Sequence, residues 1–410
     1  MKNNVVALKS HLFLSLVFCT FVAAFAVPAT ALAQDWRIEP ILGAGLEIDD
    51  NATLDIRTDQ EVKLQGYLLD AKADIRYASP KTTFFIQPRV LLRNYPDDSD
   101  FDSDDYFVRS RYSYSTRSNT FGFRGNYDYQ SVRNAERSDA DLDIDDPDEL
   151  TNDDSGRILI FGKRSKWRFS PYWDYQLSNK SSVGVSVDYF DVSYDDVFAE
   201  LLNPYTDTRL NLGYTRTISN VSKFRMTATT RRYKSERSLN DVTGVGAMLG
   251  FDRSLSQKMA FSAMIGLEDT ETAGLSTDPE VVGFVRLSQN LETIRLFAQY
   301  KRSIYATGAG RLSVRDTINV NFRRRLNDKI SAGLGVRAYR SVGTTDTPSF
   351  DDRNYIQIQA NFQWYLSRAF IAEVDYRYTI LDRTGTLSES SNANRVNLWL
   401  VWQPNSVPDI

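Results

Sequence analysis

The chain has 410 residues, a formal net charge of −4 and 42% hydrophobic residues. This slightly acidic balance offers no basic surface that could follow a phosphate backbone, which argues against nucleic acid as a partner. Beyond residue 33 no stretch approaches the ~20 apolar residues that a transmembrane helix requires. Any part of the chain beyond residue 33 that crosses a membrane must therefore do so as a closed sheet.

The first 33 residues have the pattern of a secretory signal peptide. Lys2 and Lys9 precede an apolar run over residues 12–27, and Ala31 and Ala33 form a small-residue cleavage site. We expect the mature protein to begin at Gln34. The only histidine, His11, and the only cysteine, Cys19, both precede this site, so the mature chain has no disulfide or thiol chemistry.

From about residue 36 to residue 403, apolar and polar residues alternate in segments of ten to fourteen. In the clearest segment, residues 67–77, Tyr67, Leu69 and Ile75 share one face, while Asp70 and Lys72 lie on the other. Such a strand has one side suited to lipid and one suited to water, which is typical of a transmembrane β-barrel. We expect strands near residues 36–48, 64–77, 82–94, 105–116, 120–131, 165–177, 182–193, 207–218, 222–234, 242–253, 258–269, 280–289, 292–304, 312–325, 329–341, 353–365, 369–381 and 393–403.

The connections between these segments are alternately short and long. Eight short turns of similar chemistry begin near Ser79, Arg117, Ser178, Ser219, Leu255, Asn290, Leu326 and Leu366. The pattern predicts an all-β fold, a transmembrane antiparallel barrel of about 18 strands with short periplasmic turns and long acidic extracellular loops. We expect a signal peptide at 1–33, an outer-membrane β-barrel at 34–403 and a short C-terminal tail at 404–410, in the outer membrane of a Gram-negative bacterium.

A soluble β-sandwich would use the same alternation with its apolar face turned inward. Periodicity alone does not separate these two folds. The signal peptide, the strand length and the asymmetry of the connections together favour the membrane barrel.

The polar face carries many cations and, on one late strand, a row of amides. A barrel of this size has a lumen too wide for side chains to fill, so a water-filled channel is expected. The charges either brace the wall through ion pairs or act together to select an anionic or hydroxyl-rich solute, and amides can exchange hydrogen bonds with sugar hydroxyls. The predicted solute path comprises Arg89, Arg93, Arg109, Arg111, Arg124, Arg168, Arg225, Arg231, Arg295, Lys301, Arg323, Arg337, Gln357, Gln359, Asn361, Gln363 and Arg377.

Two loops are rich in carboxylates, one over residues 97–105 and one over residues 136–154. Oxygen-rich clusters can bind calcium, yet neither loop has the glycine and glutamate spacing of an EF-hand. We interpret both as solvated, mobile external loops. No metal site and no cofactor are expected.

Catalysis is not expected either. Outer-membrane barrel hydrolases and acyltransferases use a histidine as base, and the mature chain has none. Glu373 and Asp375 stand two apart on one strand beside Arg377, which favours a structural role. We predict that the protein is not an enzyme.

The N-terminal DWRIEPILGAGLEIDDNATL, the hairpins LSQKMAFSAMIGLEDTE and RLNDKISAGLGVRAYRS, and the last strand RVNLWLVWQ resemble outer-membrane β-barrel porins associated with exopolysaccharide export. The resemblance covers most of the mature chain. It lies in the general pattern of strands and loops, since it includes no invariant motif. It implies passage of a polysaccharide through the barrel and partners in a periplasmic export machinery.

Two hypotheses of different classes remain. The first is a channel for polysaccharide or other polar solutes, with a general diffusion porin for small solutes as its simpler form. The second is a closed barrel whose acidic external loops bind a partner or a metal. Electrical conductance separates them, because a closed barrel passes little current.

Overall fold

The computed structural model describes residues 36–55, 61–137, 162–195, 202–235, 241–272, 275–276, 278–308, 310–343, 353–383 and 389–404. One sheet contains nineteen strands, of which β12 (Leu275–Ser276) has only two residues, so eighteen long strands form the wall. They are β1 (Trp36–Asp49), β2 (Leu64–Ala78), β3 (Thr82–Asn94), β4 (Ser103–Ser115), β5 (Asn119–Ser131), β6 (Lys163–Ser178), β7 (Ser181–Asp195), β8 (Tyr205–Ser219), β9 (Ser222–Ser235), β10 (Val242–Ser256), β11 (Met259–Thr272), β13 (Glu280–Asn290), β14 (Ile294–Ala306), β15 (Leu312–Asn327), β16 (Ile330–Gly343), β17 (Arg353–Tyr365), β18 (Phe370–Arg383) and β19 (Glu389–Trp402).

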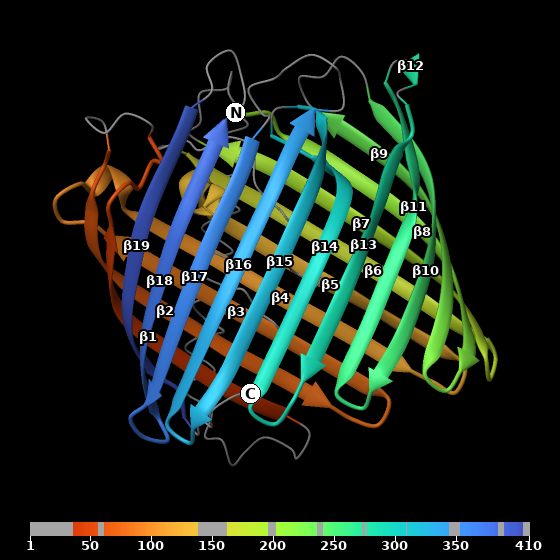
Figure 1. Cartoon of the computed structure of the whole chain (residues 1–410), viewed down its shortest axis with the longest axis horizontal. Coiled ribbons are helices and arrows are strands. Elements are labelled where there is room, and N and C mark those ends of the chain that lie inside the picture. Colours follow the sequence, from red (N-terminus) through yellow and green to blue (C-terminus); the bar gives the residue numbers. More distant parts are fainter. Residues whose placement is uncertain are drawn as a thin grey trace.

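The sheet closes on itself. Each strand pairs antiparallel with its neighbour in sequence, and β1 also pairs with β19, where Leu46 lies opposite Leu398 (Figure 1). The predicted antiparallel barrel of about 18 strands is therefore confirmed.

The side chains that alternate along each strand point in turn to the outer face of the barrel and to its lumen. On β17, Ile356 and Ile358 are 39% and 38% exposed, whereas the intervening Gln357 is 3% exposed. Similar exposed apolar side chains occur on the other strands, for example Leu212, Ile265 and Leu400. A closed wall with an apolar outer face pairs its strands internally, which is how a sheet crosses a bilayer. This architecture is that of a bacterial outer-membrane protein.

No helix within the part of the chain that the structure describes is long and apolar enough to cross a membrane.

The eight short turns lie together at one end of the barrel (Figure 1). In several of them a side-chain oxygen accepts a hydrogen bond from the backbone N–H two residues later, as Ser178 does from Lys180 at 3.2 Å and Asn327 from Lys329 at 2.8 Å. Ser and Asn favour tight turns through such local bonds. The predicted turns are confirmed.

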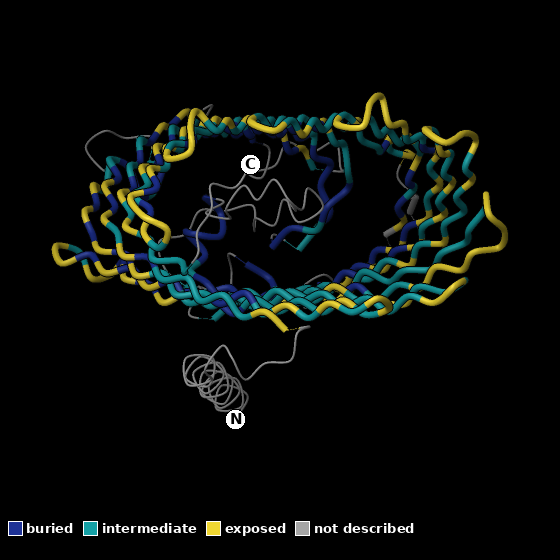
Figure 2. Tube along the Cα trace, turned by 90° about the horizontal axis from the view of Figure 1, so that it is seen from below, coloured by how far each residue is buried: buried dark blue, intermediate teal, exposed yellow. Residues whose placement is uncertain are grey.

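Two stretches of chain at the loop end lie inside the ring of strands (Figure 2). One is the α2 segment, which consists of the helix α2 (Val132–Glu136) and Arg137. The other is the hairpin tip, residues 303–308 and 310–314 at the loop end of β14 and β15.

The acidic loops differ from the prediction where the structure describes them. Residues 97–105 were expected to be solvated, but Phe101 of the short 3-10 helix η2 (Ser99–Phe101) packs with Ala52, Leu64 and Tyr95. Glu136, assigned to the second acidic loop, is 3% exposed within α2. Apolar residues interspersed among the carboxylates anchor these stretches. The remainder of the second loop, 138–154, lies outside the described residues.

Candidate functional site in the lumen

The α2 segment begins at the wall of β5. Ser131 caps the helix by accepting a hydrogen bond from the Asn134 backbone at 3.2 Å. The Asn134 side chain donates to Asp105 at 2.8 Å and to Ser103 at 3.1 Å, both on β4. These bonds fix the segment to the strands from which it emerges.

The other end of the α2 segment reaches the part of the wall around the pairing of β1 with β19. Arg137 pairs with Asp49 of β1 and donates to the Ala52 carbonyl at 3.0 Å. Tyr355 of β17 donates to the Arg137 carbonyl at 3.2 Å, and the Arg353 guanidinium lies 3.4 Å from the Glu136 carboxylate. The α2 segment therefore bridges β4 and β5 to β1 and β17 across one end of the lumen.

Tyr95, just beyond β3, completes this bridge. Its hydroxyl donates to Glu47 of β1 at 2.6 Å and accepts a hydrogen bond from Arg133 at 3.3 Å. The Arg133 guanidinium also lies over the rings of Tyr95 and Phe101, at 5.4 and 5.1 Å. Burial raises the pKa of the Tyr95 phenol, and the nearby Glu47 carboxylate raises it further. The phenol is thus held neutral as a donor.

The hairpin tip crosses the lumen in a different place. Arg209 of β8 and Arg231 of β9 donate to the Ile304 carbonyl at 2.8 and 3.2 Å, and the Asn203 N–H donates to the Gly308 carbonyl at 2.7 Å. Beneath these bonds lies a buried apolar cluster of Tyr233, Val242, Val282, Ile304, Leu312 and Val314. The hairpin tip is therefore seated on the inner face of β8 to β13.

Arg315 stands at the base of the hairpin tip with its side chain fully enclosed. Its guanidinium lies 3.8 Å from the ring centroid of Tyr305 and 4.1 Å from that of Tyr339. A desolvated guanidinium between two rings is held by strong cation–π attraction. This stack fixes where β14 and β15 leave the wall.

Two of the polar cavities against the inner wall contain many of the predicted path residues. The larger, of about 730 Å³, is lined by Arg124, Arg168, Asp188, Arg209, Arg225, Glu268, Arg286 and Lys301 among others. The smaller, of about 200 Å³, is lined by Asp70, Arg89, Arg93, Gln359, Gln363, Glu373, Asp375 and Arg377 among others. The structure thus divides much of the predicted solute path between two separate sites.

Many predicted path cations are paired with carboxylates on a neighbouring strand or, for Arg377, on the same strand. Arg93 pairs with Asp105; the other pairs are Arg89 with Asp70 at 2.9 Å, Arg168 with Asp188 at 3.8 Å, Arg225 with Asp252 at 2.7 Å, Arg231 with Asp207 at 2.8 Å and Arg377 with Asp375 at 2.8 Å. These residues brace the wall. Arg231 in particular is 3% exposed and belongs to the anchor of the hairpin tip.

The predicted amides are also engaged. Gln359 donates to Asp375 at 2.5 Å, Asn361 and Gln363 donate to Glu373 at 2.6 and 3.2 Å, and Gln357 donates to the Arg137 carbonyl at 3.5 Å. Their donors satisfy wall carboxylates and the α2 segment.

The remaining predicted cations are spread around the wall. Arg111 lies over the ring of Phe85 at 5.7 Å, and Arg337 lies 5.9 Å from the ring of Tyr339. Arg109 stands opposite Asn126 in the ladder, and Arg295 stands opposite Arg323. The structure does not gather these five residues into one cluster.

Several important residues were absent from the predicted path. Arg209 and Arg286 lie on the same alternating face as the predicted cations, so periodicity could have identified them. Tyr95, Arg133 and Arg137 lie outside the strands, and no periodic signal marks them. Among the described residues, no group of three or more Asp, Glu, His or Cys could hold a metal ion.

Comparisons with known proteins found no matching family model and no matching curated protein. Among solved structures, the chain is similar to the outer membrane channel DcaP of Acinetobacter baumannii, with 14% identity, a TM-score of 0.44, and coverage of 90% of this chain and 97% of that one. It is also similar to Pseudomonas aeruginosa OpdO, with 11% identity, a TM-score of 0.45, and coverage of 91% and 99%. A third similar structure is Acinetobacter baumannii OccAB3, with 9% identity, a TM-score of 0.45, and coverage of 90% of this chain and 100% of that one.

At these identities and scores we carry over no residue role from the three proteins. None of them is described as a polysaccharide exporter. The resemblance to export-associated porins is therefore without support from the comparisons.

Proposed function

We propose that the barrel is an outer-membrane channel for small polar solutes that prefers anions. The observation that carries this proposal is the charge of the larger cavity. Seven cationic side chains and three carboxylates line it, the cations being Arg124, Arg168, Arg209, Arg225, Arg286, Lys301 and Arg302. An excess of positive charge on a low-dielectric wall concentrates anions and lowers the barrier to their passage.

The two inward elements support a small solute over a polymer. The α2 segment is tied to one part of the wall by buried ion pairs, and the hairpin tip is tied to another part by hydrogen bonds to Ile304 and by apolar packing. A wide polymer would have to displace them. The amides that suggested sugar binding already donate to Glu373 and Asp375. Polysaccharide passage with periplasmic export partners is accordingly the weaker proposal.

The test is ion selectivity in planar bilayers. Wild-type protein should pass current, and its reversal potential in a salt gradient should indicate anion preference. Neutralising three cavity cations together in R124Q/R286Q/K301Q should move the reversal potential towards zero. The matched control K180Q/K258Q/K329Q removes the same charge from the short turns and should leave selectivity unchanged.

Each alternative has its own outcome in this experiment. A wild-type barrel that passes no current would contradict the channel and favour a closed barrel that binds a partner through its loops. Current with cation preference would contradict the proposed selectivity alone. Export is examined separately, by asking whether loss of the protein reduces surface polysaccharide in cells.

A further inference from the structure

The wall is incomplete between β13 and β14 at the loop end. β13 pairs with β11 from Glu280 onwards, where Glu280 lies opposite Glu268. Pairing between β13 and β14 begins only at Gly283 and Arg302. Above that point β14 continues to Ala306, but there it pairs only with β15 (Figure 1). We call the stretch between residues 280–282 and 303–306 the seam.

The seam follows from the position of the hairpin tip. Ile304 is held by Arg209 of β8 and Arg231 of β9, so the end of β14 leans into the lumen and away from β13. The backbone groups of β13 at the seam lose their partners on that side. A buried backbone group without a partner is costly unless another group satisfies it.

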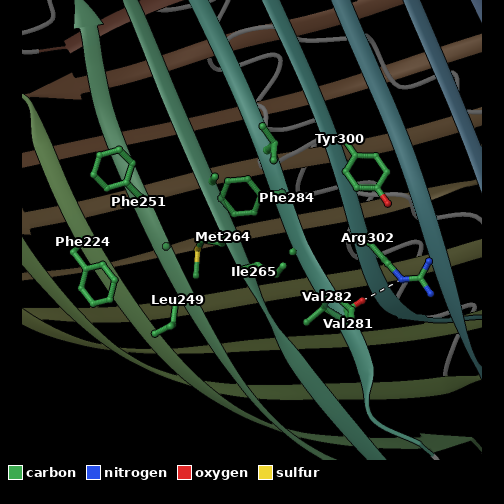
Figure 3. Close-up of a pocket in the computed structure, with 14 residues that line it drawn as sticks. Phe224, Leu249, Phe251, Met264, Ile265, Val281, Val282, Phe284, Tyr300 and Arg302 are labelled. Carbon is green, nitrogen blue, oxygen red and sulfur yellow. Dashed lines mark hydrogen bonds between the residues drawn. The ribbon is translucent and has the colours of Figure 1, made fainter.

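Arg302 supplies that group. Its Nε donates to the Val281 carbonyl at 3.1 Å, drawn as a dashed line in Figure 3. Its other nitrogens lie 3.2 Å from Glu280 on β13 and 2.9 Å from Asp316 on β15. A single side chain therefore holds the seam together where strand pairing has ceased.

An apolar hollow of about 490 Å³ lies against the outside of the seam (Figure 3). Leu249, Ile265, Val281, Val285 and Tyr300 line it and are 44% to 66% exposed on the lipid-facing side. Phe224 and Phe251 extend the apolar lining across β9 and β10. The hollow suits a hydrocarbon chain.

The hollow and the larger polar cavity share lining residues where the seam begins, at the last paired residues of β13 and β14. Val282, Gly283, Phe284 and Arg302 line both of them. Val282 and Phe284 alternate with the outward Val281 and Val285, so the shared lining includes both faces of β13. On the lumen side of these residues stand Arg286 and Lys301.

We propose that the seam is a lateral binding site for a single-chain anionic amphiphile, such as a fatty acid. The hydrocarbon chain occupies the outer hollow, and the anionic headgroup passes the seam to meet Arg286 and Lys301. The pairing of an apolar hollow with a cationic cavity through one break in the wall selects a molecule that is apolar at one end and negative at the other. This inference does not depend on whether the lumen conducts ions.

The test uses palmitic acid that carries a photoreactive diazirine near the end of its chain, added to the purified barrel in phosphatidylcholine nanodiscs. After irradiation, mass spectrometry should place the adducts on residues of the hollow, including Leu249 and Ile265. An excess of unlabelled palmitate should suppress them at least tenfold. Labelling should fall similarly in R286Q/K301Q and be unchanged in the turn variant K258Q/K329Q.

Three results would overturn the proposal. Adducts that are spread evenly over the apolar outer face of the barrel, and that unlabelled palmitate does not suppress, would show that palmitate contacts the barrel only as surrounding lipid. Equal labelling by a diazirine hexadecanol would show that the anionic headgroup does not matter. Normal labelling in a folded R286Q/K301Q barrel, verified by heat-modifiable migration, would contradict the placement of the headgroup.

Discussion

Arg315 shows how a charged residue can be fully enclosed in a barrel wall and still be stable. The rings of Tyr305 and Tyr339 lie on either side of its guanidinium. Arginine is suited to this position because its planar cation is weakly hydrated and stacks on aromatic faces, which lysine does not do. The residue is thus a packing element as much as a charge.

We predict that Arg315→Met destabilises the barrel by about 2 kcal/mol, the size of a desolvated cation–π contact. Arg315→Lys should recover little of the loss. The temperature at which the folded band converts to the unfolded band in electrophoresis measures the effect. Arg323→Met, which removes another inward arginine from the same strand, is the matched control. An unchanged conversion temperature in Arg315→Met would show that the stack is unimportant.

Tyr95 allows a prediction about pH. Because its folded pKa is raised above the ordinary value of about 10, folding favours the neutral phenol. This contribution is fully present below about pH 10 and is lost as the pH rises through the raised folded pKa. We expect alkaline solution to loosen the α2 segment, seen as increased conductance noise in wild type. In Tyr95→Phe the conductance noise should not increase in alkaline solution. Identical pH profiles of conductance noise in wild type and Tyr95→Phe would contradict this prediction.

At the scale of elements, the α2 segment is the described part of the chain that bridges β5 to β1 and β17. Arg137 holds its end through the pair with Asp49 and the bond to the Ala52 carbonyl. Breaking such a buried pair costs about 3–5 kcal/mol locally. The strand ladders do not depend on it, so the barrel itself should remain folded.

We predict that Arg137→Met increases single-channel conductance, because the released segment no longer narrows that end of the lumen. Arg76→Met removes an exposed guanidinium that pairs with the buried Asp74 on the same strand, β2, away from the α2 segment, and serves as control. Equal conductance in wild type and Arg137→Met, with both proteins folded, would indicate that the α2 segment does not narrow the path.

Strands and turns were predictable because their signals are local. Alternation has a period of two residues, and Ser or Asn in a tight turn acts within two residues. The inward bend of the hairpin tip has no such signal. Ile304 and Val314 continue the alternation of the lipid-facing residues, yet both are buried in the lumen because the whole hairpin tilts.

The candidate site was predictable only in part for the same reason. Periodicity placed Arg168 and Arg225 on the inner face, but it could not tell which cations pair with carboxylates on adjacent strands. Pairing depends on register, which links residues such as Arg225 and Asp252 that are 27 positions apart. The α2 segment contacts strands about 220 positions away, as between Arg137 and Gln357.

At the scale of the whole molecule, the orientation in the membrane remains a prediction. Cys19, within the predicted signal peptide, is the only cysteine in the sequence, so single cysteines introduced in the barrel can report on the orientation. We expect Lys180→Cys and Lys258→Cys, in the short turns, to resist an impermeant thiol reagent in intact cells. Asp241→Cys, at the opposite end, should react. Labelling of the turns from outside would reverse the orientation.

The pairing of β1 with β19 has a consequence for biogenesis. The Asn394 N–H donates to Asp50, a contact between residues 344 positions apart, so closure must wait for the last strand to be synthesised. Bringing such distant segments together is slow because it costs the chain conformational entropy. Until then every nascent chain has two bare strand edges that can pair with other chains and aggregate. Truncation anywhere within β19 should therefore leave an aggregation-prone ribbon, and a chaperone that covers both edges would be needed throughout secretion.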